Sequence, residues 1–145
     1  MKKITISLFA AVLCFCLFVF AETALAYVMA ENHPIDIEMS RMIDEDSSTA
    51  GVMEAYEYAS KEWDKLLNEN YKALMGKLSK QEQEKLRASQ REWIKYRDLE
   101  FAFNEEYWSK FMGTMYIPFP YAFQSNFVRE RALRLGFYLE DLNMK

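Results

Sequence analysis

The sequence predicts an all-α protein: a three-helix antiparallel bundle with a short N-terminal helix, preceded by a signal peptide. Long segments place apolar side chains three and four residues apart, which is the spacing of helices that bury one face. No stretch of useful length alternates between apolar and polar residues as a half-buried strand does. The length of 145 residues suits a single domain.

The first 26 residues have the pattern of a secretory signal peptide. Two lysines precede an apolar run over residues 4–20, and Ala24-Leu25-Ala26 supplies the small residues of a cleavage site. We therefore expect cleavage before Tyr27 and an exported protein, either periplasmic or secreted. The alternative is an uncleaved segment that anchors the protein in the inner membrane, although its apolar run is short for a membrane span.

The rest of the chain divides into an N-terminal segment, residues 27–48, and a helical domain, residues 49–145. In the N-terminal segment we expect a short amphipathic helix over residues 35–43, because its apolar residues recur at helical spacing. The apolar side of this helix consists of Ile35, Met39, Met42 and Ile43. Acidic and hydroxyl residues from Asp44 to Ser48 end it.

The first long helix is predicted over residues 50–77, with Ser48 or Thr49 as its N-cap. Its inward stripe consists of Tyr56, Trp63, Leu67, Tyr71, Leu74 and Leu78. Ser79 and Glu82 then have the spacing of a capping box, in which each side chain bonds the backbone N–H of the other residue. The chain is therefore expected to turn at this point.

The second long helix is predicted over residues 80–111, and its inward stripe consists of Leu86, Gln90, Trp93, Arg97 and Phe101. Gly113 and Thr114 end this helix, and Pro118 and Pro120 are expected to keep the following connection extended. A third helix is predicted over residues 121–142. Its inward stripe consists of Val128, Ala132, Leu135, Leu139 and Leu142.

Two polar side chains, Gln90 and Arg97, lie on the inward stripe of the second long helix, and buried polar groups need partners. If the first two long helices form a hairpin, Arg97 falls within one turn of Asp64, and Gln90 within one turn of Asn68. We therefore predict an Arg97–Asp64 salt bridge and a Gln90–Asn68 contact, a buried polar network that fixes helix register. The alternative interpretation is that Arg97 or Asp98 faces a groove and binds a ligand.

The same residues carry a family resemblance. The first long helix contains Trp63-Asp64, Leu67-Asn68, Tyr71 and Leu78, and the second contains Leu86, Ser89-Gln90, Trp93-Ile94 and Tyr96-Arg97-Asp98. This pattern resembles the signature of the lysozyme-inhibitor LprI-like N-terminal domain family. Further matches are His33-Pro34-Ile35-Asp36, Ser48-Thr49-Ala50-Gly51, Gly113-Thr114-Met115 and Arg131-Ala132-Leu133. The resemblance implies a small exported helical domain and, from the member that gives the family its name, an inhibitor of lysozyme-type muramidases.

Cysteine occurs only in the leader, at Cys14 and Cys16, so the predicted mature part has no disulfide, thiolate metal site or cysteine nucleophile. Sequences of the family that this chain resembles often have cysteines near Met42 and at Ala55. Both are missing here, as expected if they normally pair with each other. Hydrophobic packing must then hold the N-terminal segment in place.

The sequence contains no set of residues in a pattern typical of catalysis or of metal or haem binding. His33 is the only histidine and lies beside Pro34, where a structural role is expected. The chain has neither the Glu-x-x-His pairs of di-iron bundles nor the Cys-x-x-Cys-His of covalent haem. We therefore expect no catalysis, no metal and no cofactor. The formal charge of −4 also disfavours nucleic acid as a ligand.

The segment from Tyr107 to Tyr121 is the best candidate for contact with another protein. Prolines stiffen it, and a short stiff loop cannot easily bury all of its large side chains. We hypothesise a protein-binding surface made of Met115, Tyr116, Ile117, Phe119 and Tyr121. The alternative interpretation is that these side chains only close one end of the bundle.

At the level of function, the sequence predicts an exported, non-catalytic protein-binding module that contacts a membrane only through its N-terminal segment, if that segment is not cleaved. The resemblance implies a lysozyme-type muramidase as the partner. The alternative is a structural cell-envelope protein without an enzyme target.

Overall fold

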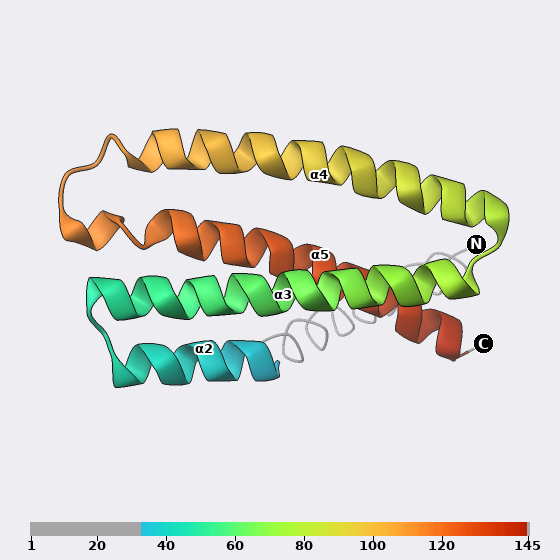
Figure 1. Ribbon diagram of the computed structural model, residues 1–145, viewed down its shortest axis with the longest axis horizontal. Coiled ribbons are helices and arrows are strands. Elements are labelled where there is room, and N and C mark those ends of the chain that lie inside the picture. The colour runs from blue at the N-terminus through green and yellow to red at the C-terminus, as the bar shows by residue number, and fades with distance from the viewer. Residues whose placement is uncertain (1–32, 145) are drawn as a thin grey trace, which may run out of the picture.

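A computed structural model describes residues 33–144, which fold into helices joined by short turns, with no strand within that range (Figure 1). The elements are α2 (Pro34–Glu45), α3 (Thr49–Lys77), α4 (Lys80–Trp108), the 3₁₀ helix η1 (Thr114–Tyr116) and α5 (Phe119–Asn143). The predicted all-α fold is confirmed, and each predicted helix is present with ends shifted by a few residues. The predicted signal peptide or anchor, residues 1–26, lies outside the described residues. Within residues 33–144, no helix has the length and apolar character that crossing a membrane requires.

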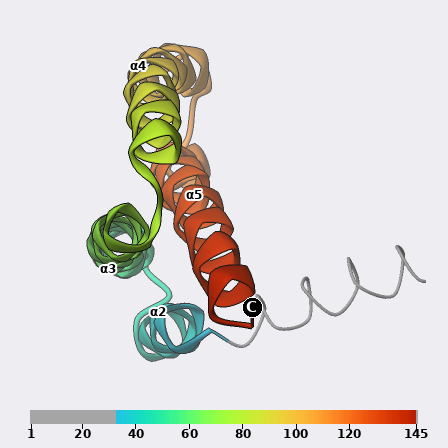
Figure 2. The same ribbon diagram turned by 90° about the vertical axis from the view of Figure 1, so that its right-hand side faces the viewer.

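The long helices run in alternating directions, and α5 lies between α3 and α4 (Figure 2). α3 packs along α5, α2 packs against α3, and α4 packs against α5. Since α4 makes few contacts with α3, the first two long helices do not form the packed hairpin that the sequence analysis assumed. The molecule is therefore built outward from the α3–α5 pair.

The core lies between α3 and α5. Trp63 is fully buried there, and the small side chains of Ala55, Ala59 and Ala132 are also fully buried, which lets the two helices approach closely. The remaining buried apolar side chains are Leu67, Leu74, Val128 and Leu135. The predicted inward stripes of both helices are therefore confirmed, and α2 and α4 cover the core with partly buried side chains such as Met39, Trp93 and Phe101.

Helix ends follow the sequence signals at two of the three turns. The Ser48 hydroxyl accepts from the Gly51 N–H, and Ser79 and Glu82 form the predicted capping box. Gly51 has no room for a larger residue, because a Cβ atom there would collide with the backbone oxygen of Asp46. The α2–α3 turn therefore depends on this glycine.

The connection between α4 and α5 differs from the prediction. Gly113 has a φ of 115°, which L side chains rarely adopt, and the chain then coils into η1. Pro118 has helical backbone angles and Pro120 lies in the first turn of α5. A proline fits there because the first N–H groups of a helix have no partner within the helix and its fixed φ is already helical. The prolines thus start α5 and do not extend the chain.

A polar and aromatic cluster holds α2 to the core. Arg129 of α5 donates to both carboxylate oxygens of Asp36: Nε lies 3.2 Å from Oδ1 and 2.9 Å from Oδ2, and Nη2 lies 2.9 Å from Oδ2. Trp63 contacts two members of this cluster. The Arg129 guanidinium lies 5.4 Å from the Trp63 ring centre, and the ring centres of His33 and Trp63 lie 4.3 Å apart. This cluster joins α2, α3 and α5, so an ion pair supplements the hydrophobic packing that the missing cysteines led us to expect.

We expect Asp36→Asn to lower the free energy of unfolding by about 2 to 4 kcal/mol, because Arg129 loses its charged partner in a mostly buried place. The matched control is Glu45→Gln, which weakens the exposed pair with Arg41 and should cost less than about 0.5 kcal/mol. Urea unfolding followed by circular dichroism measures both. Equal effects of the two substitutions would contradict the role assigned to Asp36.

His33 gives the protein a pH-dependent contact. Its Nδ1 accepts the Ile35 N–H at 3.2 Å and so caps α2 in the unprotonated state. Burial lowers the pKa of His33, while Asp36 raises it and Arg129 lowers it. The unfolded chain therefore takes up this proton at higher pH than the folded chain. The stability that His33 contributes is complete above its unfolded pKa, about 6.5, and is lost as pH falls through the folded pKa.

We expect an NMR titration to show this directly, because His33 is the only histidine of the chain and its ring signal needs no assignment. The pKa in the folded protein should lie below the value that the same signal gives in urea. His33→Asn, which keeps a capping acceptor, should remove the part of the stability loss that sets in as the pH falls below about 6.5. A folded pKa at or above the urea value would contradict the assignment.

Candidate protein-binding site

Aromatic rings gather where α4 ends and α5 begins. Trp108 stacks on Phe119 with ring centres 4.5 Å apart and an angle of 13° between the rings. Tyr116 of η1 contacts both of these rings, and Phe111 lies 5.3 Å from Tyr116. We call this group, with Tyr107, the aromatic end: Tyr107, Trp108, Phe111, Tyr116 and Phe119. Its rings support one another, so the short η1 segment has a defined shape.

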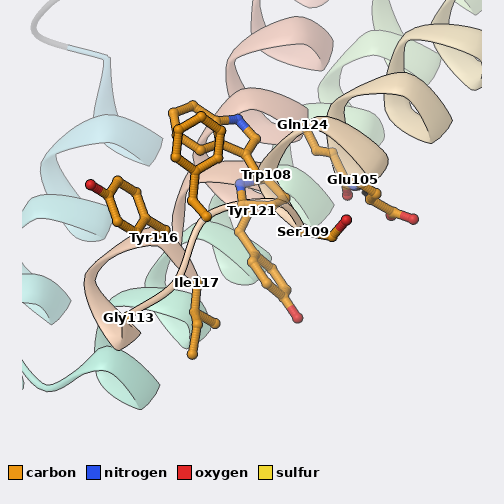
Figure 3. A pocket seen from close by; sticks show the side chains of 10 residues that line it. Glu105, Trp108, Ser109, Gly113, Tyr116, Ile117, Tyr121 and Gln124 are labelled. Carbon is orange, nitrogen blue, oxygen red and sulfur yellow. Dashed lines mark hydrogen bonds between the residues drawn. The ribbon is translucent and has the colours of Figure 1, made fainter.

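A hollow of about 400 Å³ opens beside the aromatic end (Figure 3). Trp108, Tyr116, Ile117 and Tyr121 surround it, so α4, η1 and α5 all contribute to its wall. Its polar rim includes the Glu105 carboxylate, which accepts a hydrogen bond from Gln124 Nε2 at 3.1 Å. The hollow is therefore largely aromatic, with a carboxylate and an amide at its edge.

Several apolar side chains of this region face outward. Met115 is 68% exposed, Ile117 45% and Phe119 41%, while Tyr116 and Tyr121 are partly buried. The hypothesis of a binding surface would fail if these side chains were all buried, and they are not. Both interpretations from the sequence apply in part, because the rings close the end of the α4–α5 pair and still present apolar area outside. That a protein binds there stays a prediction.

The predicted polar network does not form as expected. Arg97 bonds Asp98 on its own helix, at 2.7 and 2.9 Å, and its guanidinium lies 5.5 Å from the ring centre of Trp93. Asn68 donates to Asp64 Oδ2 at 3.0 Å within α3. The predicted Arg97–Asp64 salt bridge and Gln90–Asn68 contact were therefore wrong. The physical reason is that the inward face of α4 packs on α5, so α3 cannot supply its partners.

Asp64 and Arg97 nevertheless border a common hollow of about 350 Å³ between α3 and α4, over α5. Tyr56, Phe101 and Tyr121 also line it. The alternative interpretation, in which Arg97 or Asp98 faces a groove, is thus correct in its geometry for Arg97. Nothing in the hollow identifies a ligand.

The partner that Gln90 does have was missed in the sequence analysis. Arg131 of α5 donates from Nε to Gln90 Oε1 at 3.0 Å and from Nη2 to Ser89 Oγ at 3.3 Å. Burial lowers the pKa of Arg131, although the group stays protonated. Arg131 lies beside Ala132 on the inward stripe of α5, and this position was the signal available in the sequence. Gln90 is therefore buried on the inward stripe, as predicted, but its polar partner comes from α5 and not from α3.

Within residues 33–144, no group of three or more histidine, cysteine, aspartate or glutamate side chains is arranged to hold a metal ion. Acidic side chains of α4 pair with nearby basic ones, as Glu92 does with Lys95 at 2.9 Å. The features of the described residues that stand out are thus apolar and aromatic surfaces.

Fold and site together define a small helical protein with an exposed aromatic surface at the α4–α5 turn. A family model described as lysozyme inhibitor LprI matches residues 43–135. The match covers more than half of the sequence, so the chain belongs to the LprI family, as the sequence resemblance indicated.

A crystal structure of an uncharacterized protein from Burkholderia thailandensis is similar, with 26% sequence identity and a TM-score of 0.72. The similarity covers 77% of this chain and 56% of that chain, so this protein spans little more than half of its structural relative. No curated protein matches the sequence. The comparisons thus support the family and the fold, and the function has to be argued from the site.

We expect Gln90→Ala to lower the free energy of unfolding by about 1 to 3 kcal/mol, because it leaves the partly buried Arg131 without its main acceptor. Asn68→Ala is the control. Its side chain bonds only within α3 and is exposed, so the cost should stay below about 0.5 kcal/mol. Thermal unfolding of both variants checks this, and a larger cost for Asn68→Ala would instead support the α3–α4 network.

Proposed function

We propose that the protein is an exported, non-catalytic module that binds another protein through the aromatic end and the apolar residues beside it. The observation that carries the proposal is the exposure of Met115, Ile117 and Phe119 on a segment held in shape by stacked rings. Export is supported by the N-terminal sequence pattern. The coarser part of the proposal, a lysozyme-inhibitor-like module, is supported by membership of the LprI family.

The physical case for binding is one of entropy. A flexible loop with apolar side chains has to be ordered when a partner arrives, and that ordering opposes association. Here the Trp108–Phe119 stack, the backbone of Gly113 and the N-terminal prolines of α5 already fix the segment. Large apolar side chains on a preformed surface are typical anchors of protein interfaces.

We infer that the partner is a lysozyme-type muramidase, because the family is described as a lysozyme inhibitor. Inhibition would then be steric: the surface covers the approach to the substrate cleft, and no reactive group of the inhibitor takes part. The acidic character of the chain, with a formal charge of −4, and Glu105 at the rim of the hollow suit a basic partner.

We expect the purified protein to inhibit lysozyme in a cell-wall turbidity assay, and Ile117→Glu to raise the inhibition constant at least tenfold because a charge replaces an apolar anchor. The matched control is Ile37→Glu, since Ile37 is 56% exposed on α2, away from the aromatic end. That control should inhibit like the unmodified protein.

Failure of the unmodified protein to inhibit would exclude lysozyme as the partner and favour the structural envelope role. Equal loss in Ile117→Glu and Ile37→Glu would exclude the aromatic end as the binding surface. Each result therefore decides a separate part of the proposal.

A further inference from the structure

The outward face of α4 carries an apolar surface that begins at the aromatic end, with Tyr107, and continues toward the N-terminus of the helix. Leu99 is 71% exposed, Phe103 63%, Tyr96 54% and Tyr107 42%. These residues recur at steps of three and four, so they form one stripe, which we call the outer stripe. Leu99 and Phe103 are mostly exposed, whereas Tyr96 lies at the edge of the stripe toward α5, with its ring centre 5.5 Å from that of Phe127. A helix in a small protein rarely leaves such a row of large apolar side chains in water.

Charged pairs flank the outer stripe at both ends. Near its start, Lys95 bonds Glu92 at 2.9 Å, and near its end Lys110 lies 3.6 Å from Glu106. All four side chains are more than 60% exposed. The order of sign is negative then positive at both ends, so the two ends become complementary when one helix is reversed against another.

Positions along the helix make this complementarity specific. Glu92 and Lys110 each lie nine residues from position 101, on opposite sides of it, and Leu99 and Phe103 each lie two residues from it. Lys95 and Glu106 lie six and five residues from the same point. A twofold axis across α4 at position 101 therefore sets residues of opposite charge against each other.

We propose that the protein associates with a second copy of itself through the outer stripe, with the two α4 helices antiparallel. Leu99 of one copy packs on Phe103 of the other, and Tyr96 packs on Tyr107. Glu92 then pairs with Lys110 and Lys95 with Glu106, each pairing occurring twice. Such a surface is self-complementary, as the interface of a twofold dimer must be.

The contact spans roughly 24 Å of helix, from Glu92 to the end of α4 at Trp108, at the usual rise per residue, and Lys110 lies in the turn that follows. One helix face is small compared with the surface that stable dimers bury. The dimer is therefore expected to dissociate in the micromolar range. A lipid surface fits the outer stripe less well. Its anionic headgroups repel an acidic chain, and charges that alternate in sign do not match a uniformly negative surface.

Sedimentation equilibrium of the purified protein over a concentration series tests the proposal. We expect a monomer–dimer equilibrium, with Phe103→Glu raising the dissociation constant at least tenfold. The matched control is Phe137→Glu, because Phe137 is 62% exposed on α5, outside the outer stripe. It should leave the equilibrium unchanged. A monomer throughout the micromolar range, or equal weakening by both substitutions, would overturn the proposal.

Charge exchange tests the antiparallel register. Lys110→Glu alone sets two acidic side chains against each other and should weaken the dimer at least threefold. Adding Glu92→Lys leaves one end of the stripe basic and the other acidic, and should make the dimer at least as tight as the unmodified one. A parallel pair would instead bring like ends together, so weakening in the double variant would overturn the proposed arrangement.

Discussion

The close packing of α3 on α5 is the constraint on which the rest of the structure depends. Trp63 is a large side chain and contributes much of the area buried in the core, and the alanines around it let the helix backbones come together. Because α5 occupies the middle position, α2 and α4 lie on different sides of the α3–α5 pair (Figure 2). The hollow between α3 and α4 and the free outer face of α4 both follow from this arrangement.

The sequence was sufficient to predict which side of each helix is buried. Periodicity placed Trp63, Gln90 and Val128 inward, and all three are buried. Capping residues located the turns, because Ser48 and Ser79 act through local hydrogen bonds that depend little on the rest of the chain. Predictions based on near neighbours were reliable at these positions, but the extended connection expected from Pro118 and Pro120 was wrong, because both prolines fit the start of α5.

Pairing between helices was not predictable in the same way. An apolar stripe indicates that one face of a helix is covered, but it does not indicate which other helix covers that face. Gln90 was expected to meet Asn68 and instead meets Arg131, forty-one residues further along the chain. The Asp36–Arg129 pair was missed for the same reason, since neither residue stands out in its own segment. The fully buried Ala55, Ala59 and Ala132 were the available sign that α3 and α5 approach most closely.

The outer stripe runs along α4 into the aromatic end, and Tyr107 belongs to both surfaces, which links the two proposals. Phe103 contacts Tyr107, and Tyr107 contacts Phe111, with ring centres 6.1 and 5.3 Å apart. An antiparallel α4 pair would place the two aromatic ends at opposite ends of the dimer, with their Trp108 residues roughly 21 Å apart along the helix axis. Each copy would then keep Met115 and Ile117 exposed while Leu99 and Phe103 are covered. A dimer with two outward-facing anchors gains affinity for a partner that is itself clustered on a surface, because the second contact forms at high effective concentration.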